Sequence, residues 1–123
     1  MMDMTPKLAE GASLIASYGN GGFTINNTRH EGPVFVRPNS VERLESATID
    51  ESHLSHLLAR HPGIEILLIG TGAQHVFIPP ALRYAWRDRF GVAIETMDTG
   101  AACRTFNILL AEGREVAAFL TAV

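Results

Sequence analysis

One short apolar run near the middle of the chain constrains the fold more than any other feature. Ile64-Glu65-Ile66-Leu67-Leu68-Ile69 is almost continuously apolar and is followed directly by Gly70. A run of this length that is bounded by glycine is typical of a strand buried on both faces. The run therefore predicts the central strand of a sheet.

Helices and strands are predicted to alternate through the second half of the chain. Apolar spacing, proline and glycine predict helices that end at Pro62-Gly63, run from Pro79-Pro80 to Gly91, and run from Asp98 or Thr99 to Gly113. Strands are predicted over residues 64–69, 92–97 and 116–120. This alternation indicates an α/β fold with a largely parallel sheet.

The first third of the chain is predicted to be rich in strands. Residues 14–18, 23–25, 28–31 and 34–37 have strand-like composition, and Asn26-Asn27 separates the second of them from the third. A two-residue hairpin turn needs a positive φ at both positions, which asparagine tolerates best after glycine. We expect an N-terminal β-hairpin region within a single domain over residues 13–123, preceded by a flexible arm over residues 1–12.

The composition agrees with one globular domain and excludes several functional classes. The chain has 123 residues, 46% of them hydrophobic, and a net charge of −3, which excludes a disordered chain and argues against a nucleic-acid partner. No apolar run approaches the ~20 residues that span a bilayer, so no membrane insertion is expected. Cys103 is the single cysteine and the N-terminus lacks a secretory signal, which together favour a cytoplasmic location.

The best-placed candidate ligand site follows the predicted central strand. Gly70-Thr71-Gly72 lies where open α/β sheets place binding loops, and an anionic ligand would suit the start of the third helix. The candidate ligand-binding residues are Gly70, Thr71, Gly72, Asp98, Thr99, Cys103, Arg104 and Asn107. Because His75 stands at the third glycine position of a dinucleotide-binding loop, a tight structural turn is favoured over a nucleotide site.

Three of these residues have two interpretations each. Cys103 is interpreted as a small buried side chain, with a reactive thiolate as the alternative. Arg104 opposes the helix dipole and is expected to need an anionic neighbour, either Asp98 or an external ligand. Asn107 is expected either to hydrogen-bond to a neighbouring loop, such as that of Gly70, or to face a ligand.

No metal, cofactor or catalytic residue is predicted. His53 and His56 are spaced like metal ligands on a helix, but Arg60 would project between them and repel a cation. The spacing of the chain contains no readable set of nucleophile, acid and base. This absence favours a binding protein over an enzyme.

The second predicted helix carries the basic patch of the sequence. Its predicted apolar stripe consists of Leu82, Ala85, Trp86 and Phe90, and the candidate protein-contact residues around the stripe are Arg83, Tyr84, Arg87 and Arg89. Cations are favourable in the last turn of a helix, so a solvated helix end is the simpler interpretation. Exposed arginine beside aromatic side chains is also typical of interface anchors, which leaves partner docking as the alternative.

Three motifs resemble one known family. Gly22-Phe23-Thr24-Ile25-Asn26, Ile69-Gly70-Thr71-Gly72 and the stretch from Ala102 to Arg114 are similar, in this order, to the Mth-nine-three-eight-like domains, a former domain of unknown function. That family includes a mitochondrial respiratory complex I assembly factor and an adipogenesis-associated protein. Asn27 departs from the glycine that relatives often carry.

The resemblance implies a three-layer α/β fold with a mixed central sheet, and it implies no reaction and no cofactor. It also implies a domain that acts by binding other proteins during assembly of a membrane complex. We therefore expect a non-enzymatic, cytoplasmic binding or assembly-factor-like domain with a protein partner. The alternative is a small-molecule binding protein or an enzyme, with an anionic ligand between the Gly70–Gly72 loop and the helix that starts near Thr99.

Overall fold

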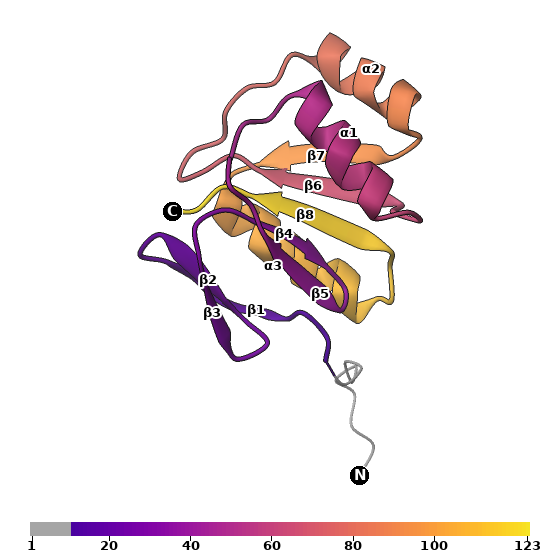
Figure 1. The fold of residues 1–123 in the computed structure, drawn as a ribbon. Helices are drawn as coiled ribbons and strands as arrows, with labels where there is room; N and C mark the ends of the chain where they lie inside the picture. The colour runs from indigo at the N-terminus through magenta and orange to yellow at the C-terminus, as the bar shows by residue number, and fades with distance from the viewer. Residues whose placement is uncertain (1–10) are drawn as a thin grey trace.

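Eight strands and three helices make up the part of the chain that the structure describes, residues 11–123 (Figure 1). The structure is a computed structural model, and all but two residues of the arm predicted over residues 1–12 lie outside the described range. The elements are β1 (Ile15–Gly19), β2 (Gly22–Ile25), β3 (Thr28–Glu31), β4 (Val34–Arg37), β5 (Ser40–Arg43), α1 (Glu51–Arg60), β6 (Ile66–Gly70), α2 (Pro80–Phe90), β7 (Ala93–Met97), α3 (Thr99–Ala111) and β8 (Val116–Leu120).

The larger sheet has the strand order β5-β4-β8-β6-β7 and mixes both strand directions. β8, β6 and β7 run parallel, whereas β4 is antiparallel to both of its neighbours. β6 is the strand predicted from the apolar run, and it lies inside the sheet with β8 on one side and β7 on the other. The mixed sheet is therefore confirmed, and two of its four strand pairings are parallel.

Two hydrophobic cores cover the two faces of this sheet and produce three layers. Because alternate residues of a strand point to opposite faces, Leu68 and Ala118 join α3 and the β1–β2 hairpin in one core. Leu67 and Phe119 join α1 and α2 in the other core. In Figure 1, α1 lies in front of the sheet and α3 behind it. The three-layer α/β architecture is confirmed.

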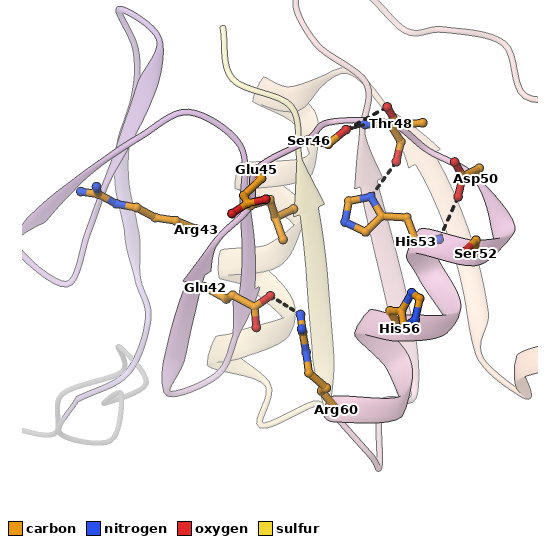
Figure 2. Close-up of a pocket in the computed structure, with 11 residues that line it drawn as sticks. Glu42, Arg43, Glu45, Ser46, Thr48, Asp50, Ser52, His53, His56 and Arg60 are labelled. Atoms are coloured by element: carbon orange, nitrogen blue, oxygen red, sulfur yellow. Dashed lines mark hydrogen bonds and ion pairs between the residues drawn. The ribbon is translucent and has the colours of Figure 1, made fainter.

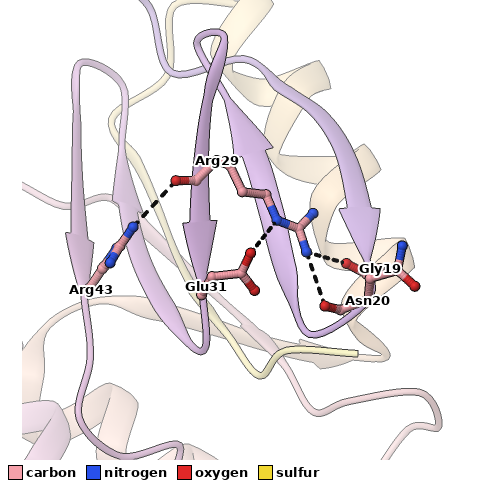
Figure 3. A network of polar contacts seen from close by, with 5 residues as sticks. All are labelled: Gly19, Asn20, Arg29, Glu31 and Arg43. Atoms are coloured by element: carbon pink, nitrogen blue, oxygen red, sulfur yellow. Dashed lines mark hydrogen bonds and ion pairs between the residues drawn. The ribbon is translucent and has the colours of Figure 1, made fainter.

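The N-terminal sheet, in the order β1-β2-β3, is antiparallel; Arg29 joins its strands, and Arg43 ties it to the larger sheet (Figure 3). Arg29 Nη2 donates to the carbonyl oxygens of Gly19 and Asn20, at 2.8 and 3.1 Å. Its Nε donates to a carboxylate oxygen of Glu31 at 2.9 Å. Arg43 of β5 donates to the carbonyl oxygen of Arg29 at 3.3 Å, so the two sheets are bonded to each other.

The helix ends lie where the sequence signals predict them. The carboxylate of Asp98 caps α3 by accepting from the backbone N–H of Ala101 at 2.8 Å. Gly91 ends α2 in the left-handed conformation, with a φ of 66°. α1 ends at Arg60, directly before the predicted stop at Pro62-Gly63.

The structure differs from the sequence prediction in two places. Ser40–Arg43 forms an edge strand, β5, that the composition does not reveal because none of its side chains is fully buried. On α2 only Trp86 is buried, whereas Leu82 is 41% exposed and Ala85 is exposed as well. α2 therefore packs through a narrower stripe than its apolar periodicity predicts.

The hairpin turn between β2 and β3 tests whether the positive φ at Asn27 disfavours a β-branched residue. Asn26 and Asn27 have φ values of 50° and 64°, as the turn prediction requires. We expect Asn27→Val to lower the free energy of unfolding by about 1–2 kcal/mol, because a β-branched residue is strained at positive φ. Asn27→Gly should keep or raise that free energy. In urea unfolding, equal midpoints for Asn27→Val and the exposed-strand control Thr28→Val would contradict this prediction.

Candidate functional site

The loop after β6 and the first turn of α3 are hydrogen-bonded directly to each other. The hydroxyl of Thr99 accepts from the backbone N–H of Gly72 at 2.9 Å and donates to the carbonyl oxygen of Thr121 at 2.7 Å. The backbone N–H of Thr99 donates to the carbonyl oxygen of Gly72 at 2.8 Å. Thr71 is buried, and its backbone N–H donates to Met97 at the end of β7 at 2.9 Å. The polar groups of this junction bind one another.

Gly70 lets the backbones of β6 and α3 approach closely. A Cβ atom at Gly70 would lie 3.0 Å from the Cα of Thr99, 3.0 Å from Leu120 Cδ2 and 3.1 Å from the Cβ of Ala102. Backbone cannot give way as the end of a flexible side chain can, so a side chain at Gly70 would push the helix away from the sheet. The space beside Gly70 is filled by the protein itself.

Asn107 points away from this loop and binds strand β1. Its Nδ2 donates to the carbonyl oxygen of Ile15 at 2.9 Å, and its Oδ1 accepts from the backbone N–H of Ile15 at 3.0 Å. The side-chain amide thus makes the two backbone hydrogen bonds that a neighbouring strand would make at the outer edge of β1. The hydrogen bond that the sequence predicts for Asn107 therefore goes to a strand 92 residues away and not to the Gly70 loop.

Arg104 lies on the exposed side of α3 beside Tyr18. Its Nη1 donates to the Tyr18 hydroxyl at 3.1 Å. A Cβ atom at Gly100 would lie 2.6 Å from the same hydroxyl oxygen, so Tyr18 lies directly against the first turn of the helix. Within residues 11–123, Arg104 forms no ion pair with Asp98 or any other acidic residue.

Cys103 is buried in the core between α3 and the sheet. Burial raises the pKa of its thiol to about 12, and the nearby Arg104 guanidinium only partly offsets that effect. The structure thus places the thiol where its neutral form is favoured.

An open depression between β5 and α1 forms a second candidate site (Figure 2). Its volume is about 690 Å³. His53 Nδ1 lies 2.8 Å from the carbonyl oxygen of Thr48, and Arg60 forms an ion pair with Glu42 across the depression. Among residues 11–123, no three His, Cys, Asp or Glu side chains are grouped so that they could hold a metal ion. Arg43 and Asp50, which also line the depression, bind backbone groups, so most of its charged side chains are engaged within the fold.

Two of the four candidate contact residues on α2 form ion pairs with neighbouring elements. Arg87 forms an ion pair with Glu95 of β7 at 3.0 Å, and its guanidinium carbon lies 5.8 Å from the centre of the Tyr84 ring. Arg89 forms an ion pair with Glu51 of α1. These two arginines tether α2 to its neighbours, so they serve the fold whatever else they contact.

Four large apolar side chains before and on α2 are exposed, and the sequence singles out only two of them, Leu82 and Tyr84. Phe77 is 72% exposed, Val76 55%, Tyr84 60% and Leu82 41%. We call the stretch from Val76 to Tyr84 the α2 surface. Sequence reasoning misses Val76 and Phe77 because an apolar run before a helix predicts burial, yet only Ile78 of that run is buried.

Known proteins resemble this chain over almost all of its length. The family described as "Protein of unknown function (DUF498/DUF598)" matches residues 15–121. The NADH dehydrogenase (ubiquinone) 1 alpha subcomplex assembly factor 3 of Bos taurus is 38% identical over 112 residues, which cover 89% of this chain and 60% of that protein. This chain therefore spans less than two thirds of the length of that curated relative.

Two solved structures share the fold. An outer membrane protein from Bartonella henselae has a TM-score of 0.78 and 39% identity, over 92% of this chain and 97% of that chain. A Mth938-like domain from Bordetella pertussis has a TM-score of 0.77 and 30% identity, over 98% and 92% of the two chains. Its description agrees with the family that the sequence motifs resemble. Of the helices in residues 11–123, none has the length and apolarity needed to cross a membrane.

Thr99 tests whether the junction of loop and helix holds the fold together. We expect Thr99→Val to lower the free energy of unfolding by about 2 kcal/mol, because it leaves the Gly72 N–H and the Thr121 carbonyl without a partner. Thr99→Ser keeps the hydroxyl and is the matched control. Chemical denaturation of both variants measures the difference. If Thr99→Val is as stable as Thr99→Ser, these hydrogen bonds contribute nothing to the free energy of unfolding.

Cys103 provides a test through pH. The folded pKa of about 12 lies above the unfolded value of about 8.5, so burial of the neutral thiol stabilises the fold below pH ~8.5. We expect that contribution to fall as the pH rises from about 8.5 towards 12, so that the stability difference between wild type and Cys103→Ala shrinks. At pH 7 a maleimide should label the folded protein slowly, and Arg104→Ala should not change the rate. Rapid labelling at pH 7 that Arg104→Ala slows would contradict this and indicate a reactive thiolate.

Proposed function

The chain belongs to the DUF498/DUF598 family, and from this premise we propose that it is a non-enzymatic binding domain that acts in the assembly of other proteins. The observation that carries the proposal is the α2 surface, where four large apolar side chains are exposed within nine residues. A group of large exposed apolar side chains is typical of protein interaction sites. The assembly-factor role named for the Bos taurus relative agrees with such a surface.

Arg83, Tyr84, Arg87 and Arg89 are proposed as the polar and aromatic part of this contact. Arginine and tyrosine are frequent at the energetic centres of interfaces. Arg87 and Arg89 have ion-pair partners, which leaves Tyr84 and Arg83 as the members most available to a partner protein. The apolar residues Val76, Phe77 and Leu82 extend the contact beyond the four residues.

We propose that the junction between the Gly70–Gly72 loop and α3 serves the fold rather than a ligand. The Thr99 hydroxyl binds Gly72 and Thr121, and the Asp98 carboxylate caps α3. The close approach at Gly70 occupies the space that a ligand needs. An anionic ligand or an enzymatic reaction at this junction remains the alternative prediction. A ligand there would have to displace hydrogen bonds that already join the sheet to the helix.

We also propose a cytoplasmic location, on the sequence grounds given above. The relatives do not agree on one compartment, because the protein from Bartonella henselae is described as an outer membrane protein. Fractionation of cells that carry a tagged chain decides: recovery of the chain in the membrane fraction would exclude this part of the proposal.

Affinity capture with surface variants tests the proposed function. We expect the wild-type chain, expressed in its own cells, to retain subunits of NADH dehydrogenase, identified by mass spectrometry. The double variant Phe77→Ser, Tyr84→Ser should lose them, because both side chains are exposed and their loss removes binding area without touching the core. Ile108→Ser is the matched control, since Ile108 is 59% exposed on α3.

Equal capture by all three proteins would remove the α2 surface from the proposal, and loss of capture only with Ile108→Ser would move the contact to α3. Recovery of no reproducible protein, together with turnover in a screen of metabolites, would overturn the binding function itself. Charge reversal of all three α2 arginines would not separate an effect on binding from an effect on folding, because Arg87 and Arg89 also hold the helix in place.

A further inference from the structure

Arg83 differs from the other two arginines of α2 in its surroundings. Arg87 and Arg89 have the carboxylates of Glu95 and Glu51 as partners, whereas Arg83 forms no ion pair with any acidic residue of the described chain. Arg83 is nevertheless half-buried. A half-buried guanidinium normally has a carboxylate partner, because burying an unpaired charge costs free energy.

Two hydrogen-bond donors on α2 are buried without an acceptor in residues 11–123. They are Arg83 Nε and the indole Nε1 of Trp86. Residues three positions apart leave a helix on the same side, so the two donors belong to one side of α2. Trp86 is only 3% exposed. Neither atom is accessible from outside the fold, whereas the two terminal nitrogens of Arg83 are not among the buried unpaired atoms of the described residues. These terminal nitrogens are therefore the donors that an outside acceptor can reach.

The chemistry of these donors defines the group that satisfies them. A guanidinium without an acidic neighbour pairs best with a carboxylate. The exposed Phe77 and Tyr84 require aliphatic or aromatic side chains to cover them. A polyanion such as nucleic acid fits poorly, because Glu95 and Glu51 already neutralise the other two arginines of the helix.

We propose that the α2 surface binds an amphipathic segment of a partner protein whose carboxylate accepts from Arg83. The apolar side of that segment covers Phe77 and Tyr84, and an Asp or Glu among its apolar residues pairs with the terminal nitrogens of the Arg83 guanidinium. This inference rests on the proposed function and adds the chemistry of the partner to it.

A random peptide display library tests the inference without knowledge of the natural partner. The library is selected in parallel on the wild-type chain, on Arg83→Gln and on Arg89→Gln. We expect wild type to enrich peptides that carry an acidic residue among apolar ones, and Arg83→Gln to bind those peptides at least about tenfold more weakly. Arg89→Gln is the matched control on the same helix and should change binding less than about twofold, because Arg89 already has Glu51 as its partner.

Trp86 gives a second measurement that needs only the wild-type protein. It is the single tryptophan of the chain, so its indole N–H produces one resonance in a proton–nitrogen correlation spectrum. A peptide bound as proposed shifts that resonance, and the shift disappears when the acidic residue of the peptide is replaced by glutamine. This readout keeps the proposal testable even where Arg83→Gln fails to fold.

Four results would overturn the inference: no enriched peptide, enrichment without acidic residues, an acidic preference that Arg83→Gln retains, or an unmoved Trp86 resonance. Self-association of the chain that Phe77→Ser removes would assign the surface to a second copy of this chain instead. If cellular capture depends on Phe77 and Tyr84 while the peptide results are negative, the proposed function stands and only the carboxylate inference fails.

Discussion

The rest of the structure depends on the close approach of β6 and α3 at Gly70. In register, Gly70 is level with Met97 at the end of β7 and with Leu120 at the end of β8, so three parallel strands end together beneath one helix start. Thr99 joins these ends by accepting from the loop after β6 and donating to the residue after β8. In open α/β sheets this edge commonly receives a ligand. Here the chain's own groups occupy it, and the same contacts fix α3 over the core.

Much of this arrangement could be predicted from the sequence because its signals are local. The buried strand, the cap at Asp98, the proline start and glycine end of α2, and the Asn26-Asn27 turn each depend on a few neighbouring residues. The site could be predicted less well, because its contacts join distant parts of the chain. The bond from Asn107 to Ile15 spans 92 residues, and no periodicity in the sequence points to it.

The α2 surface shows why apolar pattern alone cannot predict which side chains the fold buries. Leu82 and Phe77 are as apolar as buried residues, so composition alone predicts burial for both of them. The difference lies in how many elements are available to cover them. α3 buries six residues between the sheet and the N-terminal hairpin, whereas α2 lies beside the last strand, β7, and buries only Trp86. A helix at the end of a sheet has fewer neighbouring elements to cover its remaining apolar side chains.

The small number of buried side chains on α2 affects its stability as well as its capacity for binding. Arg87 and Arg89, which tether α2, form ion pairs that are largely exposed, and such pairs contribute only about 0–1 kcal/mol each. Elements with few buried contacts open at lower free energy than the core of the same domain. A partner that covers Phe77 and Tyr84 binds only the ordered form of α2 and therefore stabilises it by mass action. The helix with the fewest buried side chains in this fold is thus also the one that a partner of the proposed kind would stabilise most.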